Sequence, residues 1–410
     1  MRLNLLEMTR VCWLAGALGA CRGEPAPAAA DAAALADAGS DGSDTAVADS
    51  AADSAAGDVA GDVAGDTAAV RVDFSWPPDL PGPYRVGYRT APLTYVPAAD
   101  GVTRTIQLSV WYPTEATTGT PAVYYAALPI PHDDVFADAP LAPPADASGY
   151  PVHEFTHGHL GFGGSAPYMV RHFASHGWVV IAADHTGNTL ENQSDPQRPP
   201  QIYWWREADD KACLDWLEHL PGSDPLAGKV RTDKVFLTGH SFGGTDTWAL
   251  AGAGYNTQMI AANCAAGHTD VDCSLQAQAL YKAGFRDPRV AAAVSLAGGA
   301  EGNVFTLDAL TAVTIPMMIM TGSDDPGHPG GPQWDHMAHG VWVDIAGACH
   351  QTFGLGDCPG ATGAAIGPPI VWTYTLAMAR MAVLGDTGPL VGELMDGSRT
   401  PSKLVTFKRK

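Results

Sequence analysis

Residues 235–244 read VFLTGHSFGG and constrain the fold more than any other segment of the chain. A continuous apolar run, typical of a strand buried on both faces, leads directly into Gly-x-Ser-x-Gly and then into a helix-like stretch. A serine at such a tight strand-to-helix turn stands clear of the sheet. The flanking glycines let neighbouring backbone approach without a Cβ clash. We therefore predict that Ser241 is a nucleophile; the alternative is a structural turn serine in a chance motif.

Short apolar runs recur along the rest of the chain and alternate with helical patterns. The strand-like runs are 105–112, 152–156, 178–183, 234–238, 290–296, 316–320 and 341–345, and helical patterns cover 165–176, 207–220 and 366–384. Strands that alternate with helices indicate a mostly parallel sheet covered on both faces. We predict an α/β fold with a central sheet of about eight strands.

The order of the chain suggests partners for the serine. When a nucleophile occupies this kind of turn, the acid and then the histidine follow it in sequence. His350 comes just after the strand-like run 341–345, so we predict that it is the general base. The run 316–320 leads into TGSDD, which offers two adjacent candidates for the acid. Enzymes that carry this turn often read Gly-x-x-Asp at this place, and that resemblance selects Asp325; Asp324 is the alternative.

Two backbone N–H groups should bind the oxyanion that forms in such a site. One donor is expected from Phe242, the residue after the nucleophile. The other is expected from the glycine-rich loop HGHLGFGG at 157–164, where we assign it to His159, with Leu160 as the alternative. His157 and His159 are also spaced like a metal pair. No carboxylate or cysteine lies near them at ligand spacing, so we expect no metal and no cofactor.

These segments resemble the platelet-activating-factor acetylhydrolase family and its bacterial relatives, often labelled dienelactone-hydrolase-like, within the α/β-hydrolase superfamily. The segments that carry the resemblance are GPYRVG at 82–87, the strand ending VWYP at 110–113, HG at 157–158, ASHGWVV at 174–180, DHTGNT at 184–189, GHSFGG at 239–244 and HQTF at 350–353. The resemblance implies the α/β-hydrolase fold and serine-dependent ester hydrolysis.

The chain departs from this family at two places. Dienelactone hydrolases use cysteine where this chain has Ser241, so lactone specificity does not carry over. The eukaryotic acetylhydrolases place their acid after the strand that reads VSLAGG at 294–299, and no acid stands there. The acid is therefore expected one strand later, at Asp325, as in bacterial lipases and polyester hydrolases.

The expected function is that of a serine carboxylic-ester hydrolase, an esterase or lipase that forms an acyl-serine intermediate and whose substrates include short-acyl phospholipids. One alternative is a polyester or cutinase-like hydrolase. For that function the aromatic run 203–205 would line a cleft, although the same run also suits packing on the sheet. Two further alternatives are a binding protein on an inactive hydrolase scaffold and a metallohydrolase.

The net charge of −21 argues against nucleic acid as a partner. We expect a monomer that acts on a small-molecule or lipid ester.

The N-terminal segment predicts export. Arg2 and Arg10 flank a short n-region, and the apolar run at 11–20 that follows is too short to span a bilayer. The run ends in LGAC, which resembles the lipobox of bacterial lipoproteins, so residues 1–21 are predicted to be a signal peptide that leaves a lipidated Cys21. An ordinary signal peptide is the alternative.

Residues 22–70 are rich in Ala, Asp and Gly, which predicts a disordered tether. The catalytic domain is then 71–410, and the protein is expected in a bacterial cell envelope, anchored to a membrane through Cys21, or secreted.

The remaining cysteines fit an exported protein. Cys264 and Cys273 are nine residues apart, and Cys349 and Cys358 have the same spacing, which predicts two local disulfides. Cys213 is left over and is predicted to be a buried, small apolar residue.

Overall fold

The computed structural model describes residues 76–192, 199–268, 270–299, 305–358 and 362–410. The chain divides into two units, 1–66 and 67–410, and every described residue belongs to the second unit. The predicted signal peptide with Cys21 and the predicted tether at 22–70 lie outside the described residues. Within the described part of the chain, none of the helices combines the length and apolarity that crossing a membrane requires.

The described residues form one mixed sheet of eleven strands, in the order β11-β10-β9-β8-β7-β5-β6-β2-β1-β4-β3. The strands from β5 to β10 that neighbour one another pair in parallel, whereas β2, β11 and β3 pair antiparallel with their neighbours. Their bounds are β1 Arg85–Tyr95, β2 Arg104–Thr114, β3 Pro121–Tyr125, β4 Leu128–Ala137, β5 Tyr150–Thr156, β6 Val179–Asp184, β7 Val230–His240, β8 Val290–Leu296, β9 Met317–Gly322, β10 Val341–Ile345 and β11 Val405–Arg409.

The predicted fold class is confirmed, but the predicted number of about eight strands is too low. The strands missed by sequence reasoning are β1, β3, β4 and β11, which lie towards the two edges of the sheet. Their side chains alternate between buried and exposed or are mostly exposed, as in β4 and β11. Edge strands need no continuous apolar run, so hydrophobic patterning signals them weakly.

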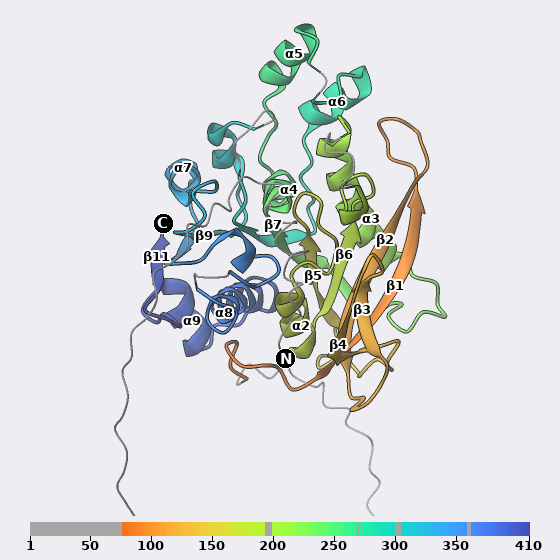
Figure 1. The fold of residues 1–410 in the computed structure, drawn as a ribbon, viewed down its shortest axis with the longest axis vertical. Coiled ribbons are helices and arrows are strands. Elements are labelled where there is room, and N and C mark those ends of the chain that lie inside the picture. The colour runs from red at the N-terminus through yellow and green to blue at the C-terminus, as the bar shows by residue number, and fades with distance from the viewer. Residues whose placement is uncertain (1–75, 193–198, 269, 300–304, 359–361) are drawn as a thin grey trace, which may run out of the picture. The chain divides into compact units, whose positions relative to one another are not determined.

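Helices cover both faces of the sheet (Figure 1). The helices α2, α8 and α9 pack together on one face, and their apolar residues form one cluster with β8, β9 and β10. The helices α3 and α4 lie on the other face, where α5 and α6 extend away from the sheet. The bounds are α2 Pro167–Ser175, α3 Ile202–Glu218, α4 Phe242–Ala251, α5 Thr257–Ala265, α6 Leu275–Ala283, α7 Gly330–His336, α8 Gly367–Ala379 and α9 Pro389–Asp396, with shorter helical turns at η1 Leu190–Asn192, η2 Leu307–Ala312, η3 His350–Thr352 and η4 Arg380–Leu384.

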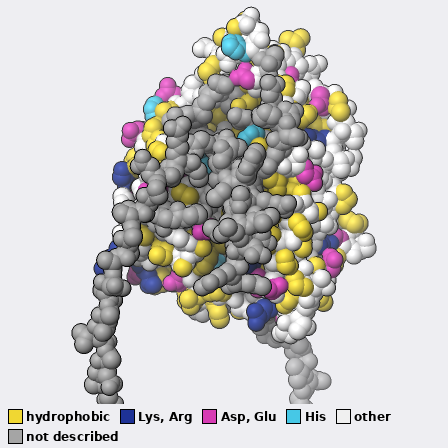
Figure 2. Space-filling model, viewed as in Figure 1, with side chains coloured by type: hydrophobic (Ala, Val, Ile, Leu, Met, Phe, Trp, Pro, Cys, Tyr) yellow, Lys and Arg dark blue, Asp and Glu magenta, His cyan; other side chains and the backbone are white. Residues whose placement is uncertain are grey.

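The aromatic run at 203–205 belongs to α3, which begins earlier than the predicted 207. Trp204 is fully buried in the core, and Trp205 lies over the guanidinium of Arg104 with 4.6 Å between that group and the ring centroid. Two of the three aromatic side chains therefore pack the helix onto its surroundings. On the face drawn in Figure 2, acidic and basic side chains are interspersed among apolar and uncharged ones.

Candidate active site

Ser241 sits between β7 and α4 in a strained backbone conformation. Its φ of 56° and ψ of −115° place it in a region that non-glycine residues rarely adopt. Its backbone N–H donates to the carbonyl of Leu296 at 2.9 Å, which ties the turn to the end of β8. Such strain persists only where the surrounding structure enforces it, and it is concentrated at functional sites. The half-buried hydroxyl stands at the carboxyl end of the central strand.

The flanking glycines of the motif are required by close backbone contacts. A Cβ on Gly239 would lie 2.0 Å from the carbonyl oxygen of Gly243. A Cβ on Gly243 would lie 2.1 Å from the carbonyl oxygen of Thr156, on the neighbouring strand β5. The turn therefore closes because neither position carries a side chain, as the motif predicted.

Asp325 and His350 meet although they are 25 residues apart. Asp325 follows β9, and His350 opens η3 just after β10; these two strands are parallel neighbours. Nδ1 of His350 lies 2.7 Å from Oδ2 of Asp325. Asp325 is buried whereas Asp324 is exposed, and the Asp324 carboxylate accepts a hydrogen bond from Ser323 instead. The structure thus pairs His350 with the first-choice acid rather than with the alternative.

His350 also lies against the residue that precedes Ser241. The rings of His240 and His350 are 4.7 Å apart, and Nε2 of His240 lies 3.0 Å from the His350 carbonyl oxygen. Burial and the neighbouring imidazoles hold the pKa of His240 well below its usual range, so His240 is neutral and can donate this bond. Among the described residues, no hydrogen bond joins the Ser241 hydroxyl to His350. In sites of this kind without substrate, such bonds are often long.

The predicted oxyanion loop runs beside Ser241. A Cβ on Gly158 would lie 3.1 Å from Cβ of Ser241. Leu160 has a φ of 55°, so the loop turns sharply just after His159. The ring of Phe242, the other predicted donor residue, lies 6.4 Å from the ring of His159 and 5.4 Å from that of Tyr203. Tyr203, the first aromatic of the run at 203–205, therefore contacts a predicted site residue.

His157 does not have a free ring nitrogen for a metal. Its Nδ1 donates to the carbonyl of Gly158 at 2.7 Å, and its Nε2 accepts from the backbone N–H of His185 at 3.1 Å. Burial, together with the charges of His185 and Arg206, lowers the pKa of His157 well below its usual value. The ring is therefore a neutral structural element of the loop, and the spacing of His157 and His159 does not create a metal pair.

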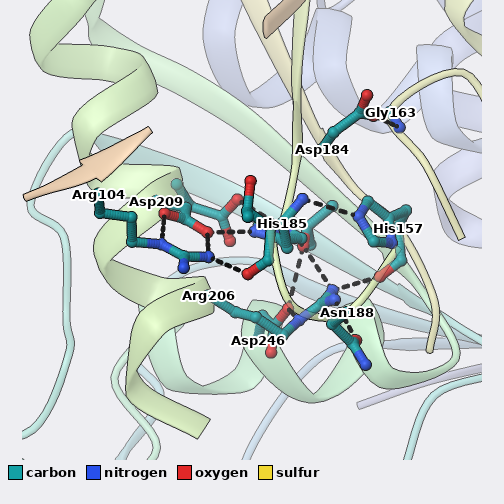
Figure 3. A network of polar contacts seen from close by, with 12 residues as sticks. Arg104, His157, Gly163, Asp184, His185, Asn188, Arg206, Asp209 and Asp246 are labelled. Carbon is teal, nitrogen blue, oxygen red and sulfur yellow. Dashed lines mark hydrogen bonds and ion pairs between the residues drawn. The ribbon is translucent and has the colours of Figure 1, made fainter. Parts of the chain in front are cut away.

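A buried polar network holds the loop at 157–164 in place (Figure 3). Sequence reasoning did not predict this network. Arg206 of α3 is fully buried and donates to the carbonyl of His157, and its Nε lies 2.7 Å from Oδ2 of Asp246 on α4. It also donates to the side chain of Asn188 at 3.0 Å, and Asn188 in turn contacts Nδ1 of His159 at 2.6 Å. One guanidinium therefore connects the oxyanion loop to the helix that begins beside Ser241.

A signal for this network is present in the sequence. Arg206, Asp209, Cys213 and Leu217 follow the 3–4 residue spacing of one helix face, and Cys213 and Leu217 are apolar. Charged residues on an apolar helix face indicate a buried ion network. Asp209 is paired with Arg104, which reaches both carboxylate oxygens from β2 at 2.7 Å, and it also bonds to Tyr95 and His185.

His185, Asp210 and Asp246 lie close enough together to be considered as metal ligands. Their surroundings do not favour a cation. Arg206 already neutralises Asp246, and Nε2 of His185 lies 3.0 Å from the hydroxyl of Thr156, closer than the 3.6 Å to Asp210. Burial raises the pKa of Asp210 well above its usual range, which favours an uncharged carboxylic acid there.

Both predicted disulfides are present in the structure, and Cys213 is free and buried, as predicted. Cys349–Cys358 closes a loop that begins one residue before His350. Cys264–Cys273 lies between α5 and α6, away from this loop. Two disulfides are typical of an exported protein.

We expect the two disulfides to have the same effect on stability but different effects on activity. Both close loops of equal length, so replacing either pair by serines should cost about 2.7 kcal/mol in unfolding free energy from loop-closure entropy. Only loss of Cys349–Cys358 should also lower kcat, because it frees the loop that carries His350. Denaturant unfolding and ester hydrolysis, measured on both double variants, check this. Equal kcat values in the two variants would show that the Cys349–Cys358 disulfide does not position His350.

Comparisons with known proteins identify a fold but no sequence family. No protein-family model and no curated protein matches the chain. Among solved structures, a ferulic acid esterase from Streptomyces cinnamoneus is similar with a TM-score of 0.52 and 18% identity, over 79% of this chain and 96% of that chain. Together with the parallel sheet and the strand-to-helix turn at Ser241, this similarity identifies the fold as that of the α/β-hydrolases.

Proposed function

We propose that this protein hydrolyses carboxylic esters through an acyl-serine intermediate, with Ser241 as nucleophile, His350 as general base and Asp325 as the acid. The observation that carries the proposal is the buried Asp325 carboxylate on Nδ1 of His350, with the same imidazole packed beside the turn of Ser241. A carboxylate on Nδ1 fixes the tautomer that leaves Nε2 free to accept a proton.

The direction of the pKa shift at Asp325 supports this role. His328 and His350 hold the pKa of Asp325 well below its usual range against the opposing effect of burial. The acid is therefore ionised throughout the neutral range and can stabilise the imidazolium that forms when His350 accepts the serine proton.

The oxyanion of the tetrahedral intermediate would be bound by the backbone N–H of Phe242 and by a second donor in the loop 157–164. We retain His159 as that donor, with Leu160 as the alternative. Arg206 supports the assignment of the loop, because it anchors the His157 carbonyl while its guanidinium lies 4.8 Å over the Phe242 ring. Donors held in place before the reaction lower the barrier most effectively.

The substrate class is proposed at the level of the ester bond. The likeness to a ferulic acid esterase supports carboxylic esters and adds esters of aromatic acids to the candidates, beside short-acyl lipids and phospholipids. A polyester or cutinase-like activity is the second candidate, because Tyr203 packs edge-on against Phe242 next to the nucleophile and offers an aromatic wall for such a chain. A panel of aryl esters from acetate to palmitate, with methyl ferulate, a short-acyl phospholipid and a polyester film, ranks these substrates.

We further propose that the protein is exported and held at a bacterial membrane by a lipid on Cys21, with residues 22–70 as a spacer. The two disulfides support an oxidising compartment. Incorporation of radiolabelled palmitate into the full chain tests the anchor; an unlabelled chain recovered from the medium would favour an ordinary signal peptide.

Asp325→Asn tests the proposed acid, and Asp324→Asn is its matched control. The neutral amide introduced at position 325 cannot stabilise a charged imidazole, so we expect kcat to fall by about 10⁴-fold and reaction with a fluorophosphonate probe to slow accordingly. The same change at the exposed neighbour should leave both rates within about twofold. If only Asp324→Asn inactivates the enzyme, the acid is misassigned. Loss of activity on chelation would instead point to a metallohydrolase.

A further inference from the structure

His328 occupies a position beside the proposed triad that the reaction scheme above does not use. It lies three residues after Asp325, on the turn that follows β9, and its backbone N–H donates to the Asp325 carbonyl at 3.1 Å. Nδ1 of His328 lies 3.1 Å from Oδ1 of Asp325, whereas Nδ1 of His350 lies 2.7 Å from Oδ2. One carboxylate is therefore held by two imidazoles, one on each oxygen.

The two imidazoles also contact each other. The rings of His328 and His350 stack with centroids 4.3 Å apart and planes inclined by 25°. On its other side His350 packs against His240, so His350 lies between two rings. The His328 side chain is 30% exposed, compared with 17% for His350, so His328 lies on the solvent side of the pair.

We propose that His328 is a positioning residue, which fixes the Asp325 carboxylate from its second oxygen and so holds Oδ2 in place for His350. The inference rests on the proposed function, since it concerns the same histidine base. It adds a residue that the sequence motif does not contain.

The positioning role of His328 follows from the geometry of the two hydrogen bonds to Asp325. A carboxylate held at one oxygen can rotate about its Cβ–Cγ bond, whereas one held at both oxygens presents Oδ2 to His350 in a single orientation. Each of these bonds involves a charged acceptor, and such bonds are about twice as strong as bonds between neutral groups. Losing the bond at Oδ1 therefore loosens the orientation of the general base.

A metal ion is a poorer explanation of the same three side chains, although their ligand atoms lie within 4.8 Å of one another. Stacked, nearly parallel rings direct their in-plane lone pairs alongside each other rather than towards one point. Both Nδ1 atoms are also engaged with the carboxylate oxygens that would have to bind the ion.

The test compares His328→Ala with His328→Asn. Alanine removes the hydrogen bond to Oδ1 of Asp325. Asparagine places an amide nitrogen near the position of Nδ1 and so retains that bond without the imidazole ring. The control is His336→Asn, because His336 is also half-exposed and paired with an aspartate, Asp308, at 3.0 Å, but has no contact with the triad in the described structure. The rate of fluorophosphonate labelling is recorded at neutral pH, which requires no knowledge of the natural ester.

We expect His328→Ala to lower the neutral-pH rate about tenfold, and His328→Asn to keep it within about threefold. His336→Asn should match wild type. A wild-type rate in His328→Ala, or an equal loss in His328→Ala and His328→Asn, would overturn the proposal while leaving the serine mechanism intact.

A second measurement separates this proposal from the proposed function. Nitrogen NMR of the imidazoles reports which ring nitrogen carries the proton. The proposal expects the Nδ1–H form for His328 in wild type and its loss in Asp325→Asn. If wild-type protein reacts with no fluorophosphonate, the proposed function fails, and the tautomer of His328 still decides whether it holds Asp325. A His328 tautomer unaffected by Asp325→Asn would overturn the positioning role.

Discussion

Ser241→Ala is expected to lower kcat for a simple aryl ester by at least about 10⁴-fold and to abolish fluorophosphonate labelling, while the protein stays folded. In the proposed mechanism the Ser241 hydroxyl oxygen forms the covalent intermediate, and no other side chain in the motif can replace it. A small rate above that of water should remain, because the predicted oxyanion donors and the substrate-binding surface are unchanged.

The stability of this variant should be close to that of wild type. Ser241 has a φ of 56°, which alanine tolerates no better than serine does, so the backbone strain remains the same in both proteins. Thermal unfolding is the control measurement. An active Ser241→Ala variant would show that Ser241 is not the nucleophile. If the variant is inactive and unfolded, Ser241→Cys is tested instead, because it keeps a nucleophile of similar size.

Arg206→Met is expected to be the most destabilising single change in the site, at about 3–5 kcal/mol. Arg206 is fully buried, and its removal leaves the buried Asp246 without its cationic partner and the His157 carbonyl without its donor. Burial already raises the pKa of Asp246 against the opposing effect of Arg206, so Asp246 should take up a proton in the variant. Denaturant unfolding measures the loss.

Two further variants make this prediction specific. Arg171→Met breaks an ion pair of similar length with Asp134, but that pair is largely exposed and should contribute no more than about 1 kcal/mol. The double variant Arg206→Met/Asp246→Leu should recover part of the loss, because it leaves no unpaired buried charge. Equal losses of unfolding free energy in Arg206→Met and Arg171→Met would contradict the importance assigned to the buried network.

Under conditions where Arg206→Met remains folded, kcat should fall by up to about 10²-fold, since the predicted oxyanion loop loses the hydrogen bond that Arg206 donates to it.

The turn at Ser241 was predictable because its signal is contiguous in the sequence. The apolar residues of β7, Ser241 and the glycines at 239 and 243 form one segment, although the contact that requires glycine at 243 is with Thr156 on β5. The pairing of Asp325 with His350 could also be inferred, since the two residues follow adjacent strands of a parallel sheet and must emerge at the same edge. The order of strands and helices along the chain was therefore sufficient to predict both the turn at Ser241 and this pairing.

The support around the site could not be derived in this way. Arg206 reaches the His157 carbonyl across 49 residues of sequence, and only the packing of α3 on the sheet brings them together. His328 lies on a loop with no periodicity, so nothing in the pattern of residues ties it to Asp325. The edge strands β1, β3, β4 and β11 escaped notice for a related reason, because partly exposed strands lack the continuous apolar runs that identify central ones.

The most direct test of the central claim is to trap the acyl-enzyme. Wild-type protein is mixed with p-nitrophenyl acetate, quenched in acid and digested, and the peptides are examined by mass spectrometry. The account predicts an acetyl group on Ser241 in the peptide that contains GHSFGG, and its absence from the same peptide of His350→Gln within the same time. An enzyme that turns over the ester while Ser241 remains unmodified, or that carries the acetyl group on another residue, would contradict it.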